Sequence, residues 1–240
     1  MQYAYLSESV KVKKVSETAT SGMFEIDGLY TGYGITVGNA LRRVLLSSLP
    51  GAAVTQIKIK GANHEFSTLP NVMEDVVEIM LNFKKIRFAI HSDEPQVLSL
   101  KVKGEKVVTS SDIKLNAQVD LISPDVHIAT LSSKGAELDI EVTVEKGLGY
   151  VPVEAQKHER LPIGVIVLDA AFSPVVKVNF TVDNMRVGDK TDYNSLKLEI
   201  ETDGSLTPSA ALRKACNILQ DHFSVISQVE VGGKDKEEEK

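Results

Sequence analysis

The spacing of apolar side chains varies along the chain, and segments in which apolar and polar residues alternate are predicted to be strands. Residues 23–27 alternate apolar and polar side chains, so residues 10–30 are expected to form two strands connected by residues 16–22. Other alternating or β-prone runs follow at 53–60, 97–102, 117–122, 138–144, 175–182 and 193–202. The chain is therefore expected to consist mainly of strands, with a few helices between them.

A short helix is predicted over residues 37–49, directly after a glycine-rich segment. Gly32, Gly34 and Gly38 predict a tight turn, because glycine adopts backbone angles at which other residues clash. Thr36 is placed to cap the first unpaired amides of the helix. Residues 49–51, Leu-Pro-Gly, are expected to end it.

This helix has two apolar faces. At about 100° per residue, the first face combines Val37, Ala40, Leu41, Val44 and Leu45. Leu46 and Leu49 lie on the far side of the helix. Arg43 projects elsewhere, on a polar strip with Asn39 and Ser47. A helix this short cannot bury both faces against one sheet, so the second face or the polar strip is expected to contact another chain.

Two more helices are predicted. Asn71 and Glu74 have the spacing of a capping box for the first, whose apolar positions are Val72, Val76, Val77, Ile79, Met80 and Phe83. Thr207 and Pro208 begin the second, whose apolar positions are Ala211, Leu212, Ala215, Ile218, Leu219, Phe223 and Ile226. The second set spans about half of the circumference, wider than the roughly 100° stripe that faces one core. The last helix is therefore also expected to have two partners.

The pattern as a whole predicts an α+β protein. Its composition shifts between the two ends of the chain and the β-rich segment 51–176, which has one short helix. Residues 232–240 have too little apolar content to fold, and are interpreted as a linker stub or disordered tail.

Composition and charge narrow the functional classes. The net charge of −6 argues against a chain-wide phosphate-binding surface, so no direct contact of this region with DNA is expected. A single cysteine, Cys216, excludes an intramolecular disulfide, fits a reducing cytosol and is expected to be packed as a small hydrophobe. No signal peptide and no run of roughly 18 apolar residues is recognisable. A cytoplasmic protein without membrane association is therefore expected.

No catalytic, cofactor-binding or metal-binding constellation is recognisable in the sequence. Asp27, Asp75, Asp169 and Asp183 stand apart from any metal-ligand pattern, and no histidine accompanies a candidate nucleophile. His222 falls on the apolar side of the last helix, where a hydrogen-bonded core or interface histidine is the expected role. Catalytic, cofactor and metal residues are therefore all expected to be absent from this chain.

Glycines before a helix also raise the possibility of a phosphate-binding turn, but the spacing argues against it. Gly32, Gly34 and Gly38 give G-x-G-x-x-x-G, one residue longer than the dinucleotide-binding pattern. Lys58 and Lys60 stand about twenty residues further on, where that pattern has a carboxylate for the ribose. No Lys-Ser or Lys-Thr pair follows the last glycine, as a Walker loop requires.

The sequence GNALRRVLLSSLPG at 38–51 resembles the signature of bacterial DNA-directed RNA polymerase α subunits. Other segments resemble the N-terminal region of that family in the same order: FSTLPNVMEDVVEIMLN at 66–82, VEKGLGYVPVE at 144–154, LPIGVIVLDAAFSPVVKVNF at 161–180 and TDYNSLKLEIETDGSLTPSAALRKA at 191–215. The series spans nearly the whole chain, so it is more specific than any single motif. The resemblance implies a division into two domains. Residues 1–50 and 177–231 form one, an antiparallel sheet with two packed helices, and the segment 51–176 is inserted into it.

The resemblance also implies a role and partners. It implies a homodimeric, non-catalytic scaffold on which the β and β′ subunits assemble into a nucleotidyltransferase, with ω and σ in the same complex but without predicted direct contact. The expected β-subunit interface comprises Asn39, Arg42, Arg43 and Ser47 of the helix, and Phe66, Ser67, Thr68, Leu69 and Pro70 of a loop. The expected dimer interface comprises Leu46, Leu49, Leu212, Ala215, Leu219, His222, Phe223 and Ile226.

Two other functions stay open at this point. One is a stand-alone nucleotide-binding enzyme that uses the turn at 32–38, and the other is a homodimeric binding module with an unrelated partner. One departure from the family is also expected. Members of the family continue through a flexible linker into a small C-terminal domain that binds upstream promoter DNA and activators, and this chain is expected to stop in the linker.

Overall fold

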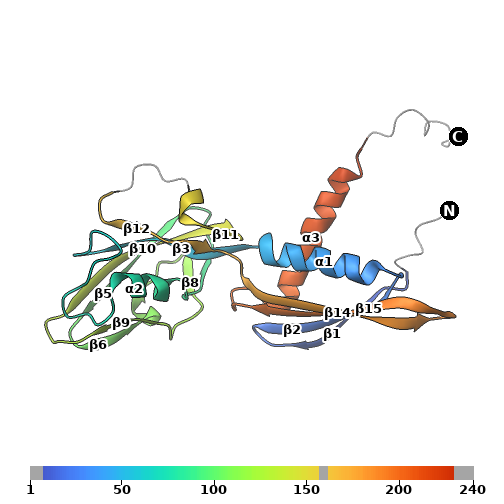
Figure 1. Cartoon of the computed structure of the whole chain (residues 1–240), viewed down its shortest axis with the longest axis horizontal. Coiled ribbons are helices and arrows are strands. Elements are labelled where there is room, and N and C mark those ends of the chain that lie inside the picture. The colour runs from blue at the N-terminus through green and yellow to red at the C-terminus, as the bar shows by residue number, and fades with distance from the viewer. Residues whose placement is uncertain (1–7, 157–161, 230–240) are drawn as a thin grey trace.

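The elements of the chain group into two lobes, which lie side by side along the longest axis (Figure 1). The computed structural model describes residues 8–156 and 162–229. One lobe, which we call the helix lobe, contains a four-stranded antiparallel sheet in the order β1-β2-β15-β14. Its strands are β1 (Lys11–Glu17), β2 (Ser21–Leu29), β14 (Val175–Val187) and β15 (Lys190–Thr202). Segments from the two ends of the sequence therefore share one sheet.

Two helices, α1 (Tyr33–Ser47) and α3 (Pro208–Ile226), pack against this sheet and against each other. Leu196, Leu198 and Ile200 alternate along β15 and are fully buried beneath the helices. Leu41 and Leu45 of α1 join them in one apolar cluster. The sheet thus has one face covered by helices, and the other face carries polar residues.

The second lobe, which we call the insert lobe, is mostly β-structure. Its main sheet has the order β7-β5-β10-β3-β4-β8, with β12 also paired to β3. Two smaller sheets pair β11 with β13 and β6 with β9. The elements are β3 (Pro50–Ile59), α2 (Val76–Phe83), β4 (Phe88–Ile90), β5 (Gln96–Lys103), β6 (Lys106–Thr109), β7 (Ile113–Lys114), β8 (Val119–Leu121), β9 (His127–Leu131), β10 (Glu137–Leu148), β11 (Tyr150–Val151), β12 (Val165–Val167) and β13 (Ala170–Ala171), with short 3-10 turns at Ser110–Asp112 and Val153–Ala155.

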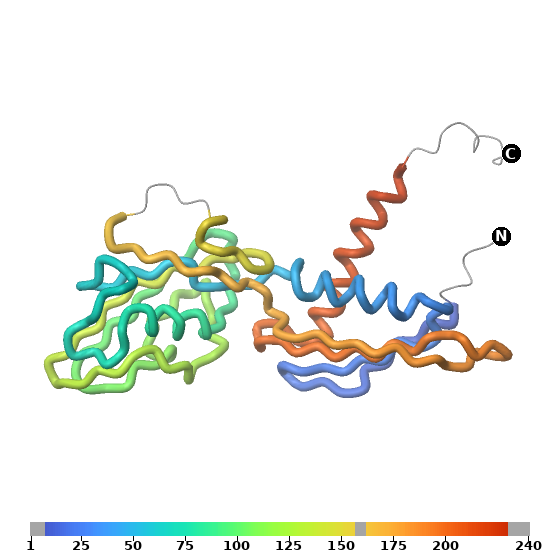
Figure 2. Tube along the Cα trace, in the orientation of Figure 1, coloured from blue at the N-terminus to red at the C-terminus, as the bar shows by residue number. Residues whose placement is uncertain are grey.

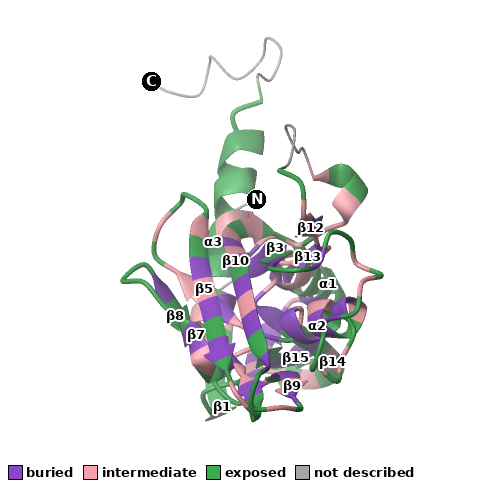
Figure 3. Cartoon of the chain, turned by 90° about the vertical axis from the view of Figure 1, so that its left-hand side faces the viewer, coloured by how far each residue is buried: buried purple, intermediate pink, exposed green. Residues whose placement is uncertain are grey.

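The core of the insert lobe is organised around β10, which pairs with β3 on one side and β5 on the other. Its residues alternate between buried and more exposed positions, as the colours along β10 show in Figure 3. The predicted alternation at 138–144 is therefore confirmed. Val76, Ile79 and Phe83 of α2 are completely buried in the same apolar cluster.

The chain crosses between the lobes twice. Residues 48–49 lead from α1 into β3, and residues 172–174 lead from β13 into β14 (Figure 2). The crossings lie close together, because a Cβ atom on Gly51, just after the first crossing, would lie 1.9 Å from the carbonyl oxygen of Phe172 in the second. The insert lobe is thus attached at one end only.

The α+β class and the element types match the expectations from the sequence, but several boundaries differ. The β1–β2 connection is shorter than 16–22, because β1 continues to Glu17 and β2 begins at Ser21. Helix α1 begins at Tyr33 and not at residue 37, and α2 begins only at Val76. The exact domain boundaries stay a prediction, and the tail 232–240 lies outside the described residues.

Candidate functional site

The start of α1 is set by β15 and not by the helix's own sequence. Gly32, with a φ of 83°, is the residue that precedes the helix. The side-chain oxygen Oδ1 of Asn194 accepts hydrogen bonds from the amides of Gly32 (2.9 Å) and Gly34 (3.2 Å). Thr36 caps nothing, since its hydroxyl donates to the carbonyl of Gly32 from inside the helix. The prediction that Thr36 is the cap is wrong.

The other two glycines allow close packing and do not form a turn. Gly34 and Gly38 lie inside α1, where a Cβ atom would come within 2.6 Å of Val182 and within 2.7 Å of Phe180, respectively. Real Cβ contacts are longer, so only glycine lets the helix approach β14 this closely. Because Asn194 already binds the amides at the helix start, the described structure offers no open phosphate-binding turn there.

The polar strip of α1 is exposed as a whole. Asn39, Arg42, Arg43 and Ser47 are all exposed to solvent. The hydroxyl of Ser47 donates to the backbone carbonyl of Arg43 at 2.7 Å and does not bind the guanidinium. Neither guanidinium makes an ion pair with any carboxylate in residues 8–156 or 162–229. The strip therefore presents the cation of Arg43 to solvent, and Arg42 presents a second one from the neighbouring position.

The loop 66–70 has one exposed aromatic side chain and one buried anchor. Phe66 is 79% exposed, and Thr68 and Pro70 are also exposed. Leu69 is packed into the core of the insert lobe, so it holds the loop in place. The assignment of Leu69 to the β-subunit interface stays a prediction, although its side chain is buried in the single chain. Met73, which the sequence analysis did not single out, is 74% exposed beside this loop.

The two parts of the expected β-subunit interface lie on different lobes. The polar strip belongs to α1 of the helix lobe, whereas Leu69 anchors the loop 66–70 in the apolar cluster of the insert lobe. A partner that contacts both parts must therefore span the junction between the lobes.

Helix α3 is divided into a buried half and an exposed half. Leu212 and Ala215 near its start are buried with α1 in the core of the helix lobe, as is Leu49 after α1. These three residues were expected in the dimer interface, and in the single chain their side chains are already buried in its own core. Their place in the dimer interface stays a prediction. Leu46 and Leu219 are half-buried at the edge of this cluster.

The second half of α3 extends away from the rest of the lobe (Figure 1). Every residue from 220 to 229 is exposed. Phe223 and Ile226 are 62% and 64% exposed, and Val225 and Val229, which the sequence analysis did not name, are exposed as well. Isolated helices gain little stability from propensity alone, so an unpacked apolar helix end of this length is a candidate contact surface.

His222 and Cys216 lie on α3, but neither is buried in the core of the helix lobe. His222 is exposed, and its Nδ1 lies 2.7 Å from the carbonyl oxygen of Ile218. Cys216 is also exposed, so the expectation of a packed small hydrophobe is wrong. Its surroundings nevertheless desolvate the thiol and raise its pKa, which lowers its reactivity at neutral pH.

The first turn of α3 is held to β1 by a carboxylate. Glu17 accepts a hydrogen bond from the amide of Ser209 at 2.8 Å and pairs with Lys14 at 2.9 Å. Thr207 caps the same turn through the amide of Ala210, as predicted. The hydrogen bonds from Lys14 and Ser209 lower the pKa of Glu17 to about 2.

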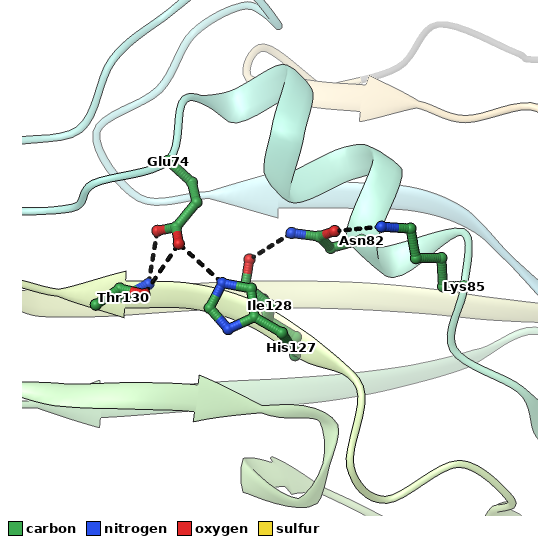
Figure 4. A network of polar contacts seen from close by, with 6 residues as sticks. All are labelled: Glu74, Asn82, Lys85, His127, Ile128 and Thr130. Carbon is green, nitrogen blue, oxygen red and sulfur yellow. Dashed lines mark hydrogen bonds and ion pairs between the residues drawn. The ribbon is translucent and has the colours of Figure 1, made fainter.

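A second carboxylate, Glu74, holds the segment before α2 against β9 (Figure 4). It accepts hydrogen bonds from the amide and the hydroxyl of Thr130, at 2.6 and 3.0 Å, and lies 2.8 Å from Nε2 of His127. Burial alone would raise the pKa of Glu74, but the hydrogen bonds from Thr130 and His127 outweigh it and the pKa is lowered. The predicted capping box is therefore wrong: Asp75 caps α2, and Asn71 has a left-handed φ of 61°.

The four aspartates that looked isolated in the sequence each have a structural role. Their partners are Lys13 and Ser195 for Asp27, the Glu78 amide for Asp75, Lys84 for Asp169, and Lys197 for Asp183. Within residues 8–156 and 162–229, no three His, Cys, Asp or Glu side chains gather as a metal ion would require. In the same residues no helix has the length and apolar character to cross a membrane.

A family model described as the RNA polymerase Rpb3/RpoA insert domain matches residues 57–173. The chain is 50% identical over 220 residues to DNA-directed RNA polymerase subunit alpha of Symbiobacterium thermophilum, covering 91% of the chain and 70% of that protein. It is 48% identical over 216 residues to the protein of the same name from Alkaliphilus oremlandii, with 90% and 68% covered. It is 52% identical over 202 residues to the protein of the same name from Moorella thermoacetica, covering 84% of the chain and 64% of that protein.

Proposed function

Because this chain belongs to the family of bacterial DNA-directed RNA polymerase α subunits, we propose that it is the homodimeric scaffold on which the β and β′ subunits assemble. One copy of the chain binds β, and the other binds β′. The ω subunit and σ factor join the same complex without direct contact with this region. The chain itself supplies no catalytic residue, cofactor or metal ligand, and it acts in nucleotidyl transfer only as a subunit.

The observation that carries the dimer is the exposed half of α3. Residues 220–229 are exposed throughout, although Phe223, Val225 and Ile226 are large and apolar. A second copy is the occupant that fits best, because the exposed residues continue directly from the buried α1–α3 contact. Leu46 and Leu219, half-buried at the edge of that contact, would be covered by the same partner.

The polar strip of α1 is the proposed contact with the β subunit. Arg43 is exposed and unpaired within the described residues, and Asn39 and Ser47 one turn away leave room for a partner carboxylate. A guanidinium can bind such a group through two parallel hydrogen bonds. Phe66 of the loop 66–70 supplies the second, apolar part of the same contact.

Copurification tests this function directly. The purified chain is expected to sediment as a dimer at micromolar concentration and to retain the β subunit on an affinity column. It is expected not to footprint upstream promoter DNA, because its net charge is −6. A dimer that retains no β subunit would contradict the scaffold proposal while leaving the dimer in place.

A further inference from the structure

The junction between the lobes is built around one aromatic side chain. Phe172 is buried and belongs to a small apolar cluster with Ala53 and Ala170, separate from the cores of both lobes. Its amide donates to the carbonyl of Gly149 at 2.8 Å. Phe172 thus lies directly before the chain enters β14 of the helix lobe, yet it is fixed to strands of the insert lobe.

Two glycines make room for Phe172. A Cβ atom on Gly147 would lie 2.6 to 2.8 Å from three ring atoms of Phe172. A Cβ atom on Gly51 would lie only 1.9 Å from the carbonyl oxygen of Phe172. Gly51 and Gly147 are paired across β3 and β10, so both strands and the crossing segment meet at this point. Any larger side chain at either position would displace Phe172.

The crossing segment is also bound to the helix lobe, and the two lobes touch each other directly. The amide of Asp203 donates to the carbonyl of Pro174 at 2.9 Å. A Cβ atom on Gly204, before α3, would lie 3.1 Å from a methyl group of Ile122 in the insert lobe. A groove of about 320 Å³ is lined from the insert lobe by Phe88 and from the helix lobe by Leu206. The crossing segment is therefore held to the insert lobe through Phe172 and to the helix lobe through Pro174.

We propose that Phe172, seated against Gly51 and Gly147, is the positioning residue that fixes the angle between the two lobes, and thereby the separation between the α1 polar strip and the loop 66–70. The inference rests on the proposed function, because it assigns that separation to the capture of a single β subunit. It adds a residue that touches neither the partner nor the dimer interface.

The reason that a fixed angle matters is entropic. When two contacts lie on rigidly joined parts, binding through one holds the other close to its target. If the lobes moved independently, part of the binding free energy would be lost in ordering them. Phe172 is well placed to prevent such motion, because its ring lies against the backbone of Gly147 in β10 and its carbonyl oxygen against the backbone of Gly51 in β3.

A measurement without any partner tests the joint itself. Spin labels at two exposed positions, Asp125→Cys in the insert lobe and Thr181→Cys in the helix lobe, report the distance between the lobes in a Cys216→Ser background. Labelled chain is mixed with excess unlabelled chain, so that most dimers carry one labelled copy. A single narrow distance distribution is expected for the unmodified junction, and a clearly broadened one for Phe172→Ala.

Matched variants separate the joint from general damage to the fold. Gly51→Ala is expected to shift the mean distance between the labels, because its methyl group would meet the Phe172 carbonyl. Phe172→Leu keeps an apolar side chain, so it is expected to broaden the distance distribution less than Phe172→Ala does. Gly135→Ala is the control, since a Cβ atom there has no neighbour within 4 Å, and it is expected to change nothing. Folded Phe172→Ala protein with the unmodified distribution would overturn the proposal.

A second experiment measures how tightly the same variants bind the β subunit. Phe172→Ala is expected to weaken capture roughly 10-fold to 100-fold through loss of the fixed geometry, with the dimer unchanged. Capture at unmodified affinity by a chain whose distance distribution is broadened would overturn the link between angle and assembly. Failure of Arg43→Ala to weaken capture would instead contradict the proposed function, and the distance measurements would still decide whether Phe172 fixes the angle.

Discussion

The two lobes enclose their apolar residues to different degrees. In the insert lobe, the short helix α2 buries Val76, Ile79 and Phe83 completely. In the helix lobe, the much longer α3 buries apolar residues only in its first half and leaves residues 220–229 exposed. The first lobe therefore completes its core within one chain, whereas the second is expected to complete its contacts with another chain. This difference supports the proposal that the helix lobe forms the dimer.

The largest expected effect is the loss of stability when a side chain in the core of the insert lobe is truncated. Phe83→Ala removes a fully buried ring from the insert lobe and is expected to lower the free energy of unfolding by about 3 to 5 kcal/mol. Urea denaturation measures this loss, and faster hydrogen exchange at the β10 amides assigns it to the insert lobe. Phe223→Ala, the same change at an exposed position, is expected to leave β10 exchange unchanged. Equal effects of both variants on β10 would contradict the contrast between the lobes.

The second effect concerns partner capture. Arg43→Ala is expected to weaken association with the β subunit by roughly 2 to 5 kcal/mol, because the partner group would be left unpaired. Dimer mass should not change, since Arg43 is exposed and lies outside the apolar cluster of the helix lobe. Arg43→Lys should restore capture only in part, as an ammonium group cannot make the planar two-pronged contact. Dimeric Arg43→Ala protein with unchanged β affinity would show that the strip is an ordinary solvated helix face.

The smallest effect is a pH dependence at the start of α3. The pKa of Glu17 falls from 4.5 to about 2 on folding, so its stabilising contribution is present above about pH 4.5 and lost as the pH falls through about 2. Glu17→Gln should therefore speed hydrogen exchange at the Ser209 amide at neutral pH. The difference from the unmodified chain should shrink as the pH is lowered toward 2. A difference that does not depend on pH would rule out the carboxylate as its source.

Local patterns in the sequence predicted local structure well. The alternation at 138–144 predicted β10, and Thr207 with Pro208 predicted the start of α3, because strand period and helix capping depend on neighbouring residues only. The start of α1 could not be predicted in the same way. Its capping group is supplied by Asn194, which lies on β15 and is distant in the sequence.

The division of apolar residues between core and surface was also beyond the sequence. A wide apolar arc predicted two partners for α3. The structure shows one of them, the core of the same lobe, and the arc did not indicate which residues pack there. Leu212 and Ala215 are buried because α1 lies across the first half of α3, and Phe223 is exposed because nothing in the described chain reaches the second half. Similarly, Leu69 anchors its loop because of packing in the insert lobe, which no local pattern reveals.

Sedimentation equilibrium of the unmodified chain and of Phe223→Asp, at micromolar concentration, tests the central claim most directly. The unmodified chain is expected to have the mass of a dimer, near twice 26.1 kDa. Phe223→Asp is expected to be a folded monomer, because the new charge would be buried unpaired in the dimer but is solvated in the single chain, where position 223 is 62% exposed. A monomeric mass for the unmodified chain, or a dimer unaffected by the aspartate, would contradict the account.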